Sequence, residues 1–295
     1  MRIGCAYLVA ISRFGFPPRP KDNLTAIEDV ASAGFDGIEF EAIAGLNLEG
    51  IIQLQDKIRD SLIRHNLDVA SFTAVIPELY SSDTGQQAAS LATFEKMAEL
   101  ANALGTSVID FCPYLPSELA GVAGSELYLG GPPTRISPAE GFSWDRFWNH
   151  AVDTTARCSE IAAKYELKMA IEGRIGDFVA TTDGVLGLLA KCDPKITGVL
   201  LDLAHVHAAK EYLELVIPKL GKRILHVHIA DNLGDQAYHL PMGEGNIDFS
   251  MVINLLRQVG YEGYLCVDLG GVDHVWEKSV GDLKKLRSLL GLSKV

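Results

Sequence analysis

Short apolar runs alternate with longer amphipathic stretches along the whole chain. Strand-like runs occur at residues 2–8, 35–41, 67–73, 106–112, 168–173, 197–202, 223–230 and 263–269. The stretches between them repeat apolar residues at three- and four-residue steps, as in Ile51, Leu54 and Ile58. This spacing is typical of helices that bury one face. The pattern therefore predicts eight strand–helix units in strict alternation.

This alternation predicts the fold class. Strands separated by helices are typical of a parallel sheet, and eight such strands can close into a barrel. A doubly wound open sheet is the alternative, but the GxGxxG turn common in that fold does not follow the run 2–8. We therefore predict an α/β protein in which residues 1–295 form one (β/α)8 TIM barrel.

One segment departs from the regular alternation. Residues 113–143 follow the fourth strand-like run and are rich in Pro and Gly, including Gly-Gly-Pro-Pro at 130–133. Loops longer than about 15 residues are uncommon in a compact domain and often cover a site. We interpret 113–143 as a lid or a subunit contact, with a disordered insertion as the alternative.

Charge and composition exclude several kinds of partner. The net charge of −12 is spread along the chain, which disfavours binding to nucleic acid because that requires a basic face. No apolar run approaches the roughly 20 residues of a membrane helix, and the chain opens directly with a strand-like run. The five cysteines include no CxxC pair, so we expect free thiols, a core position for Cys112, and a cytoplasmic location.

Four of the apolar runs end in residues that can bind a metal. These residues are Glu172, Asp202, His228 and Asp268. Because the carboxyl ends of parallel strands meet at one rim, we expect the four side chains to converge. Carboxylate oxygens and an imidazole nitrogen suit one divalent cation. The sequence therefore predicts a metal site at this rim.

Other polar residues stand close to these strand ends. His205 follows the second strand end by three residues and can face the same ligand. His226 and His228 alternate on one strand, so both should point to the same side of the barrel wall, with His226 deeper. We expect Asp231 and Asn232 to hydrogen-bond a metal-bound imidazole or a sugar hydroxyl.

These residues resemble those of the xylose isomerase-like TIM barrels, a superfamily of sugar isomerases, epimerases, keto-acid dehydratases and endonuclease IV. The series includes Asp202-x-x-His205 and His228-x-x-Asp231 between the carboxylates of the fifth and eighth strands. The run Phe-Asp-Gly-Ile-Glu at 35–39 resembles the second strand of that group. The turn containing Pro-Met-Gly-Glu-Gly at 241–245 resembles the segment after its seventh strand.

The resemblance implies one divalent ion, with Mn²⁺ expected first and Mg²⁺, Co²⁺ or Zn²⁺ as alternatives. Its ligands would be Glu172, Asp202, His228 and Asp268. Such an ion acidifies the carbon beside a ketone and stabilises the enediolate. In the tagatose 3-epimerase-like branch, the carboxylates at the positions of Glu172 and Asp268 also move the proton.

The resemblance also implies substrate contacts. His205 would bind a substrate oxygen, and Arg174 is a candidate at the rim. Glu39 would anchor another hydroxyl, with a structural salt bridge as the alternative.

Two positions depart from the epimerase branch. Asp268 stands where the epimerases carry Glu, so its shorter side chain can bind a metal without reaching the substrate carbon. The Arg that usually follows the His-x-x-Asp motif is absent, since Leu233 and Gly234 occupy that region. His239 precedes the Gly-x-Gly turn and is a candidate catalytic base, metal ligand or substrate contact.

The leading hypothesis is an isomerase or epimerase that acts on an unphosphorylated keto sugar or inositol-like polyol through an enediolate. The alternative is a lyase using the same enolate, either an inosose or dehydroshikimate-type dehydratase or an enzyme that cleaves 3-keto-glycosides or C-glycosides. An endonuclease IV-like DNA repair enzyme is a remote alternative, because the second to fourth strand-like runs contain no His. We expect a homo-oligomer, with a second type of subunit as the alternative.

Overall fold

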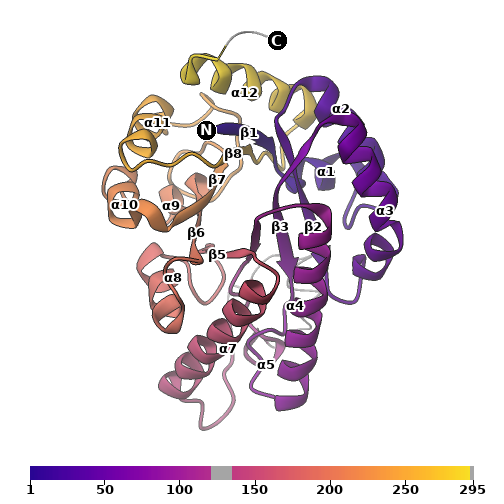
Figure 1. The fold of residues 1–295 in the computed structure, drawn as a ribbon. Coiled ribbons are helices and arrows are strands. Elements are labelled where there is room, and N and C mark those ends of the chain that lie inside the picture. Colours follow the sequence, from indigo (N-terminus) through magenta and orange to yellow (C-terminus); the bar gives the residue numbers. More distant parts are fainter. Residues whose placement is uncertain (121–134, 293–295) are drawn as a thin grey trace.

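The computed structural model of the protein describes residues 1–120 and 135–292. Its strands form one closed parallel barrel in chain order, with β8 paired to β1 (Figure 1). The strands are β1 (Arg2–Cys5), β2 (Gly37–Ile43), β3 (Asp68–Val75), β4 (Val108–Phe111), β5 (Lys168–Glu172), β6 (Thr197–Asp202), β7 (Ile224–Ile229) and β8 (Tyr264–Val267). The predicted TIM barrel is confirmed.

Helices surround the barrel, and α12 near the end of the described chain packs against α1 and β1 near its start (Figure 1). The helices are α1 (Tyr7–Phe14), α2 (Asp22–Ala33), α3 (Leu48–His65), α4 (Thr84–Leu104), α5 (Ser117–Ala120), α7 (Trp144–Lys164), α8 (Thr182–Leu188), α9 (Leu203–Ala208), α10 (Leu213–Leu220), α11 (Phe249–Gln258) and α12 (Val275–Leu290). Two 3-10 turns, η1 (Leu189–Lys191) and η2 (Gly221–Arg223), follow α8 and α10. Among the described residues, no helix has the length and apolar character needed to cross a membrane.

The first strand is shorter than the sequence predicted. The run 2–8 was assigned to one strand, but β1 ends at Cys5 and α1 begins at Tyr7. A continuous apolar run fits a buried helix as well as a buried strand, and α1 buries Tyr7, Val9 and Ala10. The prediction was therefore wrong at this boundary because periodicity alone cannot separate the two.

The segment 113–143 is only partly described. It contains the short helix α5 and ends at Ser143, whose side chain caps α7 by accepting a hydrogen bond from the Arg146 N–H. The Gly-Gly-Pro-Pro run at 130–133 lies outside the described residues. The interpretation of this segment as a lid or subunit contact stays a prediction.

Alternation along the strands separates an apolar outer face from a polar interior. Phe111 of β4 packs edge-on against Phe94 of α4, with ring centroids 5.6 Å apart. On β2, Phe40 belongs to the same apolar core, whereas the preceding Glu39 contacts His228 of β7. Since β2 and β7 are not neighbours, this contact crosses the inside of the barrel. Near the carboxyl ends of the strands the interior therefore carries polar groups, whereas the outer face packs against the helices. Deeper inside, alternate strand residues such as Ala170 and Leu200 form a small apolar cluster.

Gly198 on β6 allows a close approach of two strands. A Cβ atom at this position would overlap the carbonyl oxygen of Arg223, just before β7, and the side chain of Leu225. Because the obstructing atoms include backbone, we expect Gly198→Ala to lower the free energy of unfolding by about 1–3 kcal/mol in denaturant titrations. The matched control is Gly281→Ala in α12, where a Cβ would meet no atom within 4 Å. Equal stability of the two variants would contradict this account of the β6–β7 contact.

Candidate active site

A cavity of about 430 Å³ opens at the carboxyl ends of the strands. The predicted site residues that line it are Glu39, Glu172, Arg174, His205, His228, His239 and Asp268. Asp202 is not part of this lining, but its Oδ2 lies 3.6 Å from Nδ1 of His228, which is. The structure thus brings together the strand ends that the sequence selected.

The two carboxylate oxygens of Asp202 have different environments, one in a helix cap and one facing the site. It ends β6 and caps α9, where Oδ1 accepts a hydrogen bond of 2.8 Å from the backbone N–H of His205. Its Oδ2 is buried and has no hydrogen-bond partner among the described residues. Burial would raise the pKa of Asp202, but His205, His239 and His228 together hold it well below its usual value. An ionised, unpaired oxygen in such a place is costly unless a cation or donor binds it.

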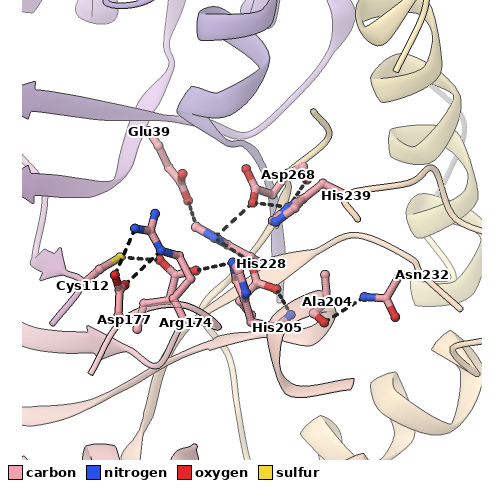
Figure 2. Close-up of polar contacts among 12 residues, drawn as sticks. Glu39, Cys112, Arg174, Asp177, Ala204, His205, His228, Asn232, His239 and Asp268 are labelled. Carbon is pink, nitrogen blue, oxygen red and sulfur yellow. Dashed lines mark hydrogen bonds and ion pairs between the residues drawn. The ribbon is translucent and has the colours of Figure 1, made fainter. Parts of the chain in front are cut away.

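The two ring nitrogens of His228 also have different environments, one in contact with Glu39 and one facing the site. Nε2 lies 3.0 Å from Oε1 of Glu39, which also lies 2.5 Å from Nε2 of His226. Nδ1 lies 3.5 Å from Oδ2 of Asp268 (Figure 2). It lies 3.6 Å from Oδ2 of Asp202, and both distances are beyond good hydrogen-bond distance. Burial would lower the pKa of His228, but the charges of Glu39 and Asp268 raise it well above its usual value. The Glu39 contact therefore fixes the ring with Nδ1 toward the site.

Glu172 ends β5 and is held by a thiol. Its Oε2 lies 2.9 Å from Sγ of Cys112, and its Oε1 lies 4.0 Å from Nε2 of His205. Burial, followed by the nearby charge of Asp202, raises the pKa of Glu172 to about 7. Burial and the charge of Asp202 therefore both disfavour a negative charge on Glu172. A divalent cation bound to Glu172 would stabilise that charge.

The donor set fits a divalent cation. One potential ligand atom from each of Glu172, Asp202 and His228 lies within 4.8 Å of the others, and all three residues are buried. Oxygen and imidazole donors suit Mn²⁺, Mg²⁺, Co²⁺ and Zn²⁺. Unpaired buried atoms on Asp202 and His228 strengthen the fit. These three residues would hold the ion, with Asp268 near enough to approach it.

Asp268 and His239 form a pair at the edge of this cluster. Nδ1 of His239 lies 2.9 Å from Oδ2 of Asp268 and 3.0 Å from its carbonyl oxygen (Figure 2). Burial would lower the pKa of His239, but Asp268 and Asp202 raise it to about 9. His205 lies against His239 with ring centroids 5.3 Å apart, and burial lowers the pKa of His205 to about 3. The imidazoles of His205 and His239 are therefore expected to carry different charges at neutral pH.

Arg174 forms a salt bridge with Asp177, three residues further along the chain. Its Nε donates to Oδ2 of Asp177 at 3.0 Å, and its guanidinium lies 4.9 Å from the ring centroid of Tyr114. Burial would lower the pKa of Arg174, but Asp177, Cys112 and Tyr114 raise it well above its usual value. Arg174 thus lines the cavity as a paired cation.

The structure gives Asp231 and Asn232 a role other than the one expected. Oδ2 of Asp231 accepts hydrogen bonds from the backbone N–H groups of Gly243 and Gly245, and its Oδ1 accepts one from Ile247. Nδ2 of Asn232 donates to the carbonyl of Ala204 in α9. Both residues hold the loop after β7 in place, so their expected contact with an imidazole or a sugar was wrong.

Two further side chains of the cavity, those of Cys112 and Glu41, were not recognised from the sequence. Cys112 was interpreted as a core thiol, yet it contacts Glu172. Glu41 lies two positions after Glu39 on β2 and lines the cavity. This two-residue spacing could have identified Glu41, because alternate residues of a strand share a face. No comparable sequence signal marks Cys112.

The fold and the site define a (β/α)8 barrel with a mouth lined by carboxylates and imidazoles. The model of the xylose isomerase-like TIM barrel family matches residues 27–286, and the chain belongs to this family. The resemblance drawn from the strand ends is therefore confirmed.

Relatives and solved structures agree with this assignment. The chain is 25% identical over 277 residues to inosose dehydratase of Lactiplantibacillus plantarum, covering 85% of this chain and 83% of that protein. It is 29% identical over 156 residues to an uncharacterised protein of Methanocaldococcus jannaschii, a match that spans half of each chain. A D-tagatose 3-epimerase-like protein superposes with a TM-score of 0.77 at 20% identity, covering 99% of this chain and 97% of the other. The IOLI protein, whose structure contains zinc, superposes with a TM-score of 0.75 at 18% identity, covering 99% and 98%. At these identities the superpositions show the fold.

Metal uptake should release protons. The charges of Glu39 and Asp268 raise the pKa of His228, which favours a proton on Nδ1, and this nitrogen must lose its proton to bind a cation. We expect titration calorimetry of Mn²⁺, repeated in buffers of different ionisation enthalpy, to show net proton release at pH 7. The apparent affinity should weaken as the pH falls, by up to about tenfold per pH unit for each proton displaced. Binding without proton release would contradict the assignment of His228 as a ligand.

Proposed function

We propose that this protein is a divalent-metal-dependent isomerase or epimerase acting on an unphosphorylated keto sugar or inositol-like polyol through an enediolate. The observation that supports this most is the convergence of Glu172, Asp202 and His228, each of which directs one donor atom into the same small volume. A bound Mn²⁺ would polarise the ketone of the substrate and lower the barrier to losing the proton at the neighbouring carbon. A cytoplasmic location and a homo-oligomer stay predictions.

The side chains of the site then have separate roles. Glu172, Asp202 and His228 hold the ion, and Asp268 completes the set while orienting His239. Glu39 acts through His228, because its Oε1 is occupied by two imidazoles. Of the two roles considered from the sequence, we therefore favour the structural salt bridge over the substrate contact.

The two remaining imidazoles face the substrate. His205 is neutral at pH 7 because burial lowers its pKa to about 3, so it can share a hydrogen bond with a substrate oxygen. His239 has its Nδ1 engaged by Asp268, which leaves Nε2 for the substrate. We assign proton transfer at the substrate carbon to His239 and Glu172, with Asp268 orienting His239.

The charges around the cavity support an uncharged substrate. Among the described residues that line it, Arg174 is the one guanidinium, and it is paired with Asp177. No lysine is present in that lining. A phosphate or carboxylate group on the substrate would therefore meet mainly carboxylates, which disfavours sugar phosphates.

A lyase that uses the same enolate is the second candidate. The inosose dehydratase of Lactiplantibacillus plantarum matches 85% of this chain at 25% identity. The pair of His239 and Asp268 also suits elimination, because a protonated imidazole can donate its proton to a leaving hydroxyl or glycosidic oxygen. An inosose or a 3-keto-glycoside would be the substrate in that case.

Hydrogen exchange in D₂O separates the two candidates. The Mn²⁺-loaded protein is incubated with keto sugars, inososes and 3-keto-glycosides, and deuterium is located by NMR and mass spectrometry. Deuterium beside the ketone together with an epimer or isomer supports the isomerase, whereas an unsaturated or aglycone product supports the lyase. Glu172→Gln should lower exchange at least about 100-fold, and the exposed Glu160→Gln on α7 should leave it unchanged. Absence of exchange on every substrate by the metal-loaded protein would refute both candidates.

His239→Gln should affect turnover more than metal binding. Removal of the group that transfers a proton is expected to lower kcat by about 100-fold or more. The Kd for Mn²⁺ should change little, because the imidazole is assigned to the substrate. His65→Gln at the end of α3 is the control and should leave kcat unchanged. A His239→Gln variant that loses Mn²⁺ in parallel with activity would instead identify His239 as a ligand.

A further inference from the structure

Cys112 lies at the edge of the proposed metal site without belonging to any ligand group found there. It is the first residue after β4 and is 3% exposed. On one side it packs with Ile43, Val75 and Tyr114. On the other, its Sγ lies 2.9 Å from Oε2 of Glu172 on the neighbouring strand β5.

The direction of this hydrogen bond follows from the chemistry of the two groups. A carboxylate that binds a cation has lost its proton and can only accept. The Cys112 thiol has an S–H that can donate, and its sulfur lies 2.9 Å from Oε2. The thiol is therefore the donor, and Oε2 is the acceptor.

The same arrangement occurs at the other two proposed ligands. In Asp202, Oδ1 is held by a backbone N–H and Oδ2 is left for the site. In His228, Nε2 is held by Glu39 and Nδ1 is left for the site. Glu172 follows this pattern only because the Cys112 thiol holds Oε2 and leaves Oε1 on the side of His205.

We propose that Cys112 is a positioning residue that restrains Glu172 to present Oε1 alone to the metal ion. The side chain of Glu172 has free rotation about its terminal carboxyl bond. Without the thiol donor, Oε2 would have no fixed partner, and the carboxylate could rotate or bind with both oxygens. The inference rests on the proposed function for the metal, whereas the hydrogen bond itself does not depend on it.

Three substitutions separate hydrogen bonding from packing. Cys112→Ser keeps a donor, Cys112→Val keeps an apolar side chain in contact with Ile43 and Val75, and Cys112→Ala removes both. Cys158→Ala removes a buried thiol from α7 and is the matched control. Circular dichroism and thermal unfolding establish that each variant is folded before it is used.

The first measurement is the affinity for Mn²⁺ alone, by titration calorimetry. Loss of a residue that orients a metal ligand typically weakens metal binding about 10- to 100-fold. We expect that loss in Cys112→Val and Cys112→Ala, and near-normal affinity in Cys112→Ser and Cys158→Ala. Normal affinity in folded Cys112→Val, or an equal loss in Cys112→Ser, would overturn the proposal.

The second measurement tests the hydrogen bond without metal or substrate. The infrared S–H stretch of Cys112 is assigned from the difference between the wild-type protein and Cys112→Ser. In Glu172→Ala this band should move to higher frequency, because the thiol has lost its acceptor, and an unmoved band would overturn the proposal. If the wild-type protein binds no Mn²⁺ at all, the metal-dependent function fails, while the infrared result still decides the Cys112–Glu172 contact.

Discussion

The arrangement of the polar groups inside the barrel depends on the carboxylate of Glu39, which contacts two imidazoles. It is 2% exposed and lies on β2, where it meets two imidazoles from β7 across the inside of the barrel. A buried carboxylate without partners would be neutralised or would destabilise the fold. Burial alone would raise the pKa of Glu39, but His228 and His226 hold it below its usual value. The site therefore depends on an ion-pair cluster that links the non-adjacent strands β2 and β7 across the inside of the barrel.

Each proposed ligand has its own contact within the protein. The Glu39 contact orients His228, the start of α9 orients Asp202, and the Cys112 thiol contacts Glu172. In each of these three side chains, one donor atom contacts the protein. The second donor atom is directed toward the other two proposed ligands. Such preorganisation lowers the entropic cost of assembling a coordination sphere, because the rotamers are restricted before the ion arrives. The three contacts are of different kinds. His228 has a salt bridge, Asp202 caps a helix, and Glu172 accepts a side-chain hydrogen bond.

The sequence could predict the parts of the site that topology controls. Glu172 and Asp202 are the last residues of β5 and β6, and His228 is the last but one of β7. Parallel strands in a closed barrel must bring their carboxyl ends together. The partners of these residues could not be predicted in the same way. Glu39 and His228 are 189 positions apart, so their pairing depends on which inward-facing layer each occupies after the barrel has closed.

The sequence predicted least well those residues whose type fits two different environments. A buried cysteine after a strand is usually a packing residue, and only the register of β4 against β5 brings Cys112 to Glu172. The same ambiguity affected α1, whose apolar run fits a strand or a helix. For Asp231, the neighbouring His-x-x-Asp pattern pointed to the site, but its carboxylate is occupied by backbone N–H groups of the following turn.

The balance of charge explains how one barrel can accommodate this site with and without a cation. Glu39, Glu172, Asp202 and Asp268 are all buried, and imidazoles supply the nearest positive charges to most of them. In the metal-free protein, protons on His228 and His239 offset part of this negative charge, as their raised pKa values indicate. A divalent cation would replace the proton on Nδ1 of His228 with a larger charge at nearly the same point. Protons and a divalent cation would therefore be alternative counter-charges for one set of carboxylates, which would allow the site to form during folding and bind an ion afterwards.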